Sequence, residues 1–216
     1  VDSRTRIDMS GDNDRMITDQ RATLGVSWEG SNWGIHSSSV VNYTFQGEVS
    51  LDVYEAYASM DLMGYAYATM GRQALNYGSG MIVGSNEWGA NRNTRDGFTF
   101  GLDLDMADIT VGYNNVNLGT DPQNSGDYLF VNASRSAGAL TANLLYATQS
   151  TTTEGVEASG QDYMGLDLGY SMMDGDLMIN GMYNTATDDD AGIDMDVTMV
   201  GATYNVSDNM TISASQ

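Results

Sequence analysis

The chain of 216 residues carries 29 acidic and 8 basic residues, all eight of them arginine, for a formal net charge of −21. This balance argues against nucleic-acid binding, and the absence of cysteine excludes disulfide scaffolds, zinc ribbons and thiol catalysis. Hydrophobic residues make up 41%, too many for a disordered acidic chain, yet no apolar run is long enough for a transmembrane helix. Two classes remain: a soluble all-β protein and a membrane β-barrel.

The dominant sequence period is two. Ile109, Val111 and Tyr113 alternate with small or polar residues, and similar runs begin at Leu140, Met164 and Leu177. One apolar face and one polar face are what a strand between two unlike environments requires. We expect thirteen strands, beginning near Arg4, Thr18, Trp33, Glu48, Tyr65, Gly97, Ile109, Tyr128, Leu140, Gln161, Leu177, Met195 and Met210.

Short turn signals alternate with longer polar stretches along the chain. Two strands, a short turn and a long loop repeat about every 33 residues, which is typical of outer-membrane barrels. A soluble β-sandwich is the alternative, but its strands average only about five or six residues. We therefore predict an all-β, antiparallel transmembrane barrel, a single domain over residues 1–216. Because single-chain bacterial barrels usually have an even strand number, the odd count predicts that this domain is truncated at its C-terminal end.

Four short motifs carry a resemblance to a known family. They are Glu55-Ala56-Tyr57, Met70 to Gly78 (MGRQALNYG), Ile82 to Trp88 (IVGSNEW) and Thr94-Arg95-Asp96-Gly97. Together and in order they resemble the alginate-export-like porins of Gram-negative outer membranes. The resemblance implies an outer-membrane location and a pore for hydrophilic solutes with charged residues at a constriction. Carried over position by position, the candidate constriction residues are Arg72, Glu87, Arg92, Arg95 and Asp96.

The side on which Arg72 lies can also be argued physically. An arginine facing lipid near mid-membrane costs about 2–4 kcal/mol, so we expect Arg72 to point into the lumen. Residues of the same phase would then face the lumen, and those of the other phase would face lipid: Ala66, Ala68 and Met70 inward, and Tyr65, Tyr67, Leu75 and Tyr77 outward. Alternatively, Arg72 and Asp96 only pair to fold the loop against the wall, and Trp88 is only a loop anchor.

The net charge bears on the solute. Pores for polyanionic alginate are rich in basic residues, whereas this chain has eight arginines against 29 acids. We therefore expect passive diffusion of small neutral or cationic solutes, in contact with membrane lipid and lipopolysaccharide. The densest acidic cluster offers weak Ca²⁺ candidates in Asp188, Asp190 and Asp194, although a solvated loop explains the cluster equally well.

Enzymatic signals are weak throughout. His36 is the only histidine, and paired acids such as Asp103 and Asp105 need no catalysis to explain them. We expect no catalytic centre, no cofactor and no nucleic-acid partner. Two rival functions remain open: a secreted or surface structural or adhesive acidic β protein, and a barrel that serves as a structural partner in an envelope complex.

Overall fold

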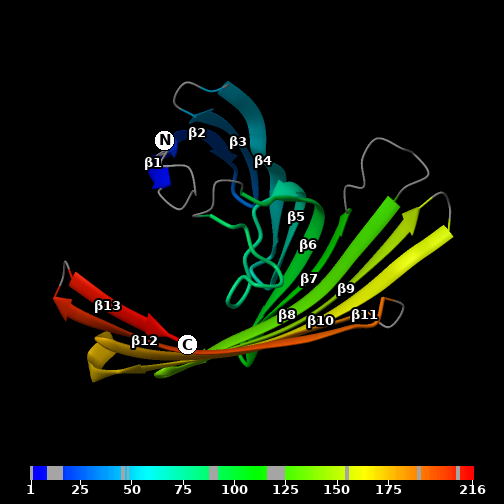
Figure 1. Ribbon diagram of the computed structural model, residues 1–216. Helices are drawn as coiled ribbons and strands as arrows, with labels where there is room; N and C mark the ends of the chain where they lie inside the picture. Colours follow the sequence, from blue (N-terminus) through cyan, green and yellow to red (C-terminus); the bar gives the residue numbers. More distant parts are fainter. Residues whose placement is uncertain are drawn as a thin grey trace.

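The computed structural model describes residues 2–8, 17–44, 47, 49–87, 92–115, 125–153, 156–188, 191–207 and 210–216. These residues form one antiparallel sheet of thirteen strands, in which every strand pairs with its neighbours in sequence. Figure 1 shows the sheet curving around one concave side, with β1 and β13 as its two edges. The single described helical segment is the 3₁₀ turn η1 (Met173–Gly175).

The predicted all-β fold and its thirteen strands are confirmed. The largest difference in starting position is at β10, where Gln161 was expected and Val156 is observed. The strands are β1 (Asp2–Asp8), β2 (Ile17–Glu29), β3 (Trp33–Thr44), β4 (Val49–Leu62), β5 (Ala66–Gln73), β6 (Arg95–Leu104), β7 (Ala107–Asn115), β8 (Ser125–Ala137), β9 (Leu140–Thr153), β10 (Val156–Met172), β11 (Leu177–Asp188), β12 (Ile193–Ser207) and β13 (Met210–Ser215).

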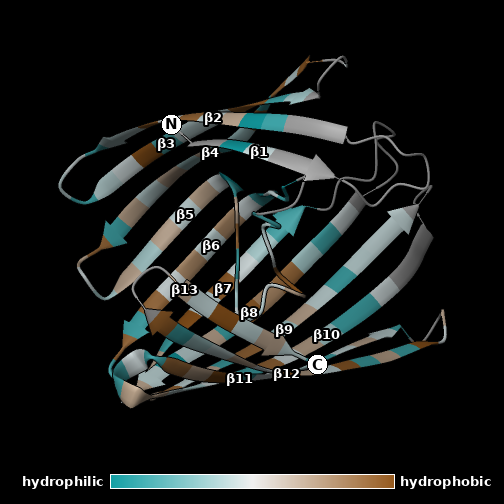
Figure 2. Cartoon of the chain, turned by 60° about the vertical axis from the view of Figure 1, so that its left-hand side comes forward, coloured by the Kyte–Doolittle hydropathy of each residue, from teal (hydrophilic) through white to brown (hydrophobic). Residues whose placement is uncertain are grey.

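The two faces of the sheet differ in chemistry. On β10 the apolar side chains Met164, Leu166 and Leu168 are 53%, 40% and 45% exposed, while the alternate positions Gly165 and Gly169 are buried. Figure 2 shows the same alternation of hydrophobic and hydrophilic residues along the neighbouring strands. On most strands the convex face is therefore apolar and open, and the small and polar residues lie on the concave face. On β12 three apolar residues reverse this phase and pair with inner residues of β11, namely Met195, Val197 and Met199.

This arrangement is not a sandwich. A sandwich packs two sheets face to face over an apolar core, whereas the described strands all belong to one sheet whose apolar face is uncovered. The soluble alternative considered from the sequence is therefore wrong in architecture. Among the described residues, no helix has both the length and the apolar character needed to span a membrane.

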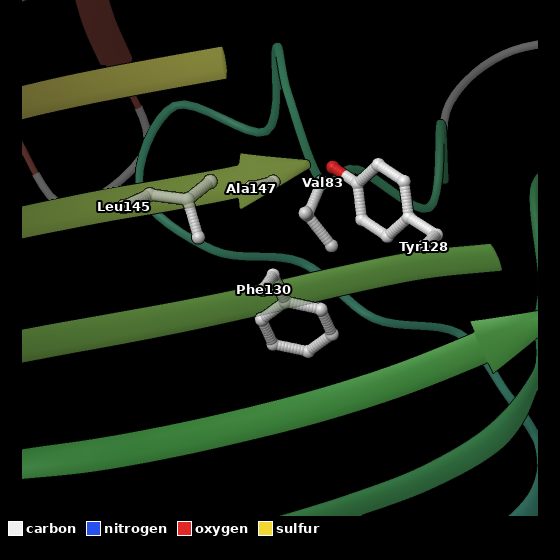
Figure 3. Packing of buried hydrophobic residues seen from close by; sticks show 5 residues of the cluster. All are labelled: Val83, Tyr128, Phe130, Leu145 and Ala147. Atoms are coloured by element: carbon white, nitrogen blue, oxygen red, sulfur yellow. The ribbon is translucent and has the colours of Figure 1, made fainter. Parts of the chain in front are cut away.

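The main hydrophobic cluster lies on the concave face, beneath the long connection between β5 and β6. Its buried members are Val83 from that connection, Tyr128 and Phe130 from β8, and Leu145 and Ala147 from β9 (Figure 3). Figure 1 shows the connection inside the curve of the sheet. We call residues 74–94 the inward loop, of which residues 88–91 lie outside the described part.

Candidate functional site

The inward loop begins directly after Gln73 and lies against the inner wall. At Gly78 the backbone φ is +56°, and a Cβ there would lie only 2.0 Å from Oδ2 of Asp167 on β10. Only glycine fits both this left-handed conformation and this close approach. Residue 78 therefore brings the loop backbone into contact with the wall formed by β9 and β10.

An apolar contact fixes the middle of the loop. Val83 is completely buried among the side chains of β8 and β9, and the ring of Tyr77 lies 5.1 Å from that of Phe130. Burial raises the pKa of the Tyr77 hydroxyl to about 12, so this side chain is neutral under ordinary conditions. Packing of the loop onto the wall therefore excludes water from the contact.

A charged contact fixes the far end of the loop. Arg4 on β1 donates to the backbone carbonyl and to Oε1 of Glu87, each over 2.9 Å, and Arg21 on β2 donates to the same carbonyl over 2.9 Å. Nη1 of Arg92 lies 3.6 Å from Oε1 of Glu87. Three guanidinium groups thus converge on one carboxylate, although their residues are far apart in sequence.

A β-bulge completes this cluster. The register between β3 and β4 shifts at Ser38 and Ser39, so that Tyr54 is an extra residue on β4 and turns inward beside Glu55. The Tyr54 hydroxyl donates to Oε2 of Glu87 over 3.1 Å, and the Arg92 guanidinium lies 3.4 Å from the centre of the Tyr54 ring. We call Arg4, Arg21, Tyr54, Glu87 and Arg92 the arginine cluster.

Arg95 also faces the interior. Its guanidinium lies 4.0 Å above the ring of Tyr128, which belongs to the buried apolar cluster. Three of the five residues proposed from the resemblance, namely Glu87, Arg92 and Arg95, therefore lie on the concave side together with the loop.

Arg72 and Asp96 lie on the opposite, convex face. Nε and Nη2 of Arg72 each donate to an Asp96 carboxylate oxygen over 2.7 Å. The alternate residues point inward, as the hydrogen bond between the buried pair Thr99 and Gln73 shows. The expectation that Arg72 faces the lumen was wrong. Arg72 lies at the end of β5 nearest the loop, where Asp96 compensates its charge through two parallel hydrogen bonds, so the arginine need not face the lumen.

The faces predicted for several residues near Arg72 in sequence are also wrong, because they were assigned from its phase. Tyr67 bonds to Thr110 on the inner face, Tyr77 packs on the inner apolar cluster, and Met70 is 69% exposed on the convex side. The prediction that Tyr67 and Tyr77 face lipid was therefore wrong, as was the inward assignment of Met70. Leu75 also packs against the inner cluster rather than outward.

The inward loop separates the concave side into two regions. One, of about 510 Å³, adjoins the arginine cluster. Beyond the loop lie two further cavities of about 560 and 600 Å³, which share Gly78, Asp108, Ser134 and Asn143 in their walls. The second region is lined by amides, hydroxyls and carboxylates, and Arg135 is the one basic residue among its described lining residues.

Comparisons with known proteins add a likeness to porins. No family model and no curated protein matches the chain. A triple mutant of the Rhodopseudomonas blastica porin aligns with a TM-score of 0.45 at 9% identity, covering 98% of this chain and 89% of that one. In-vitro folded OmpT, an outer-membrane protein of Vibrio cholerae, aligns with a TM-score of 0.44 at 10% identity, covering 99% and 82%. These values assign the chain to no family, and the alginate-export resemblance stays a resemblance.

The weak calcium candidates do not come together. Asp188 is buried on the inner face of β11 and accepts a hydrogen bond from the Ala191 amide over 2.9 Å. Its cross-strand partner is Ile193, so the next residue, Asp194, points to the opposite face. Asp190 and Trp88 lie outside the described residues. Within the described part of the chain, no group of three or more His, Cys, Asp or Glu side chains could hold a metal ion.

The sequence reasoning missed the members of the arginine cluster that lie on the wall. On β2, Arg21 belongs to the polar phase, and Leu24 and Val26 belong to the apolar phase. The period-two pattern could therefore have assigned Arg21 to the interior. Arg4 pairs directly with Arg21 and shares its face. No local pattern indicates that both residues contact Glu87, because that contact depends on where a distant loop lies.

Proposed function

We propose that this protein is an outer-membrane porin, through which small hydrophilic solutes diffuse passively past a constriction formed by the inward loop. The observation that carries the proposal is a distribution of side chains opposite to that of a soluble protein. On most strands apolar residues lie on the outer, convex face and polar residues lie on the concave face, around a loop held inside. A lipid-facing wall with a polar lumen requires this pattern.

Paired tyrosines and aspartates near the long-loop ends of the strands support a membrane boundary at that level. Three such pairs lie on the convex face, in three successive hairpins, and each joins diagonal neighbours on two paired strands. They are Tyr113 with Asp127, Tyr146 with Asp162, and Tyr183 with Asp196. In the first two, the tyrosine hydroxyl donates to the carboxylate, over 3.0 Å for Tyr146. Amphipathic rings topped by charges are typical of the interface between apolar lipid and water.

The charges inside favour neutral or cationic solutes. Three arginines are grouped around Glu87 on one side of the loop, while Asp103, Asp108 and Asp167 line the wider region on the other side. Acids in a confined passage attract cations and repel anions, and the net charge of −21 acts in the same direction. Lipid and lipopolysaccharide are the partners that this location implies.

Detergent dependence tests the proposal against a secreted structural or adhesive β protein. After refolding with detergent, the protein should be monodisperse in size-exclusion chromatography and should aggregate when the detergent is removed, because its convex face is apolar. A protein that stays folded and monodisperse in plain buffer would contradict the porin proposal and support the structural one. A barrel serving only as a structural partner would depend on detergent but conduct no ions.

A further inference from the structure

One cavity on the concave face has the features of a ligand site rather than of a plain passage. It has a volume of about 560 Å³ and lies beneath the start of the inward loop. Small-molecule sites typically measure roughly 300–1,000 Å³. The lining residues that matter here are Tyr67, Tyr77, Asp103, Asp108, Asn132 and Asn143.

Tyr67 provides a rigid aromatic surface in this cavity. Its ring occupies the space where a side chain at residue 101 would lie, since a Cβ on Gly101 would be 2.1 Å from its Cζ. Its hydroxyl is 3.0 Å from that of Thr110. Tyr67 as a whole residue is nevertheless 43% exposed, although its side chain points to the inner face. A fixed ring with an open apolar surface is suited to stacking against a ligand.

In each of two nearby amide side chains, one atom lacks a hydrogen-bond partner within the described part of the chain. Oδ1 of Asn132, a residue only 3% exposed, and Nδ2 of Asn143 have no partner among the described residues. Asn132 pairs with Leu145 and Asn143 pairs with Ser134, so the two amides are diagonal neighbours on β8 and β9. Buried polar atoms without partners are destabilising. An unpaired acceptor and an unpaired donor thus lie in one wall of the cavity, although both atoms are buried in the present arrangement.

The charges of the cavity restrict the ligand further. Asp103 and Asp108 are directly opposite each other on β6 and β7, a destabilising arrangement of like charges. None of the described residues that line the cavity is basic. Carboxylates accept hydrogen bonds from hydroxyl groups and repel phosphate or carboxylate groups. The ligand should therefore carry hydroxyls and no negative charge.

We propose that this cavity binds a neutral sugar, with the apolar face of a sugar ring on Tyr67 and its hydroxyls shared among Asn132, Asn143 and the two carboxylates. A sugar hydroxyl both donates and accepts, so one ligand pairs with the unpaired acceptor and the unpaired donor when the two amides turn toward the cavity. A simple cation would leave Tyr67 and the amide donor unused. The inference rests on the proposed pore function and names the class of its solute.

Isothermal titration calorimetry of the detergent-refolded protein with maltotriose tests this inference. We expect saturable binding to the unaltered protein and binding about tenfold weaker in Tyr67→Ala, which removes the stacking surface. Tyr67→Phe keeps the ring and should retain most of the affinity. Tyr170→Ala, which removes a tyrosine from the convex face, is the matched control and should bind like the unaltered protein.

Two results would overturn the inference: no saturable heat with maltotriose, maltose or glucose, or equal affinity in Tyr67→Ala and the unaltered protein. If Tyr67→Ala does not fold, Asn143→Ala replaces it, with the same expected loss. Calorimetry does not require conduction. A protein that conducts ions but binds no sugar contradicts only the sugar site, whereas one that binds sugar without conducting contradicts the pore.

Discussion

Glu87 is the residue on which the charged end of the inward loop depends. Its carboxylate receives a hydrogen bond from Arg4 over 2.9 Å and one from Tyr54 over 3.1 Å, and Arg92 lies within ion-pair distance. The carboxylate compensates one of the three positive charges of the cluster. Without it, three guanidinium groups would lose the carboxylate that they share.

Glu87→Gln should therefore make the pore less cation-selective. The amide keeps the size and an acceptor oxygen but removes one negative charge beside three arginines, which raises the potential in the passage. The zero-current potential in a potassium chloride gradient measures the change. Asp194→Asn, which removes the same charge from the convex face, is the control. Equal zero-current potentials for Glu87→Gln and Asp194→Asn would show that the cluster does not border the ion path.

Arg72→Ala should leave selectivity unchanged, because the ion pair between Arg72 and Asp96 lies on the convex face. The side chains are 40% and 54% exposed, so the loss in unfolding free energy should stay below about 1 kcal/mol. Arg95→Ala removes the same charge from the concave face and should increase cation selectivity. If the zero-current potential shifted as much for Arg72→Ala as for Arg95→Ala, Arg72 would have to border the ion path, which contradicts its position on the convex face.

The inward loop is held by two unlike contacts, one apolar at Val83 and one charged at Glu87. The glycine at residue 78 permits the backbone of the loop to approach the wall closely. Because the contacts lie on different parts of the sheet, the loop spans the concave side rather than lying along one strand. Loosening either contact should widen the passage.

Val83→Asp should release the apolar contact, since an unpaired carboxylate cannot be buried among Tyr128, Phe130 and Leu145 without a large cost. We expect a higher single-channel conductance with the sheet still folded, as circular dichroism would check. Met81→Asp, at an exposed position of the same loop, introduces the same charge and should conduct like the unaltered protein. Equal conductance of the two variants would mean that the loop does not narrow the pore.

The strands could be predicted from the sequence because alternation is a local property. On β7 the polar phase Thr110, Gly112 and Asn114 is buried and the apolar phase faces out, as the pattern indicates. On β5 both phases contain small or apolar residues, so the sequence does not show which phase faces inward. A shift of one residue in phase moves every side chain to the other face, and the wrong phase was predicted for Arg72. The hydrogen bond between Gln73 and Thr99, which depends on the pairing of β5 with β6, decides the phase.

The arginine cluster could be predicted only in part, for a different physical reason. Arg92 and Glu87 belong to one loop and were candidates together, whereas Arg4 is 83 residues away from Glu87 in the chain. Contacts at such separations follow from how the sheet curves and where the loop crosses it. Neither property has a local sequence signal.

In the molecule as a whole, the two faces of the single sheet differ in chemistry, and the proposed pore depends on this difference. On most strands from β2 to β13 the convex face exposes large apolar side chains, and the concave face holds the polar wall, the loop and the arginine cluster. β12 is an exception, because Met195, Val197 and Met199 lie on the concave face. In water, an exposed apolar surface of this extent would promote aggregation; in a bilayer it is the surface that contacts lipid. The two environments predict opposite behaviour for the same chain.

Single-channel recording of the refolded protein in a planar lipid bilayer shows whether the protein forms a cation-preferring pore. Insertion should produce discrete conductance steps, and the zero-current potential should have the sign expected for a preference for cations. Membranes that receive the folded protein and stay electrically silent, or currents that favour anions, would contradict the proposed pore.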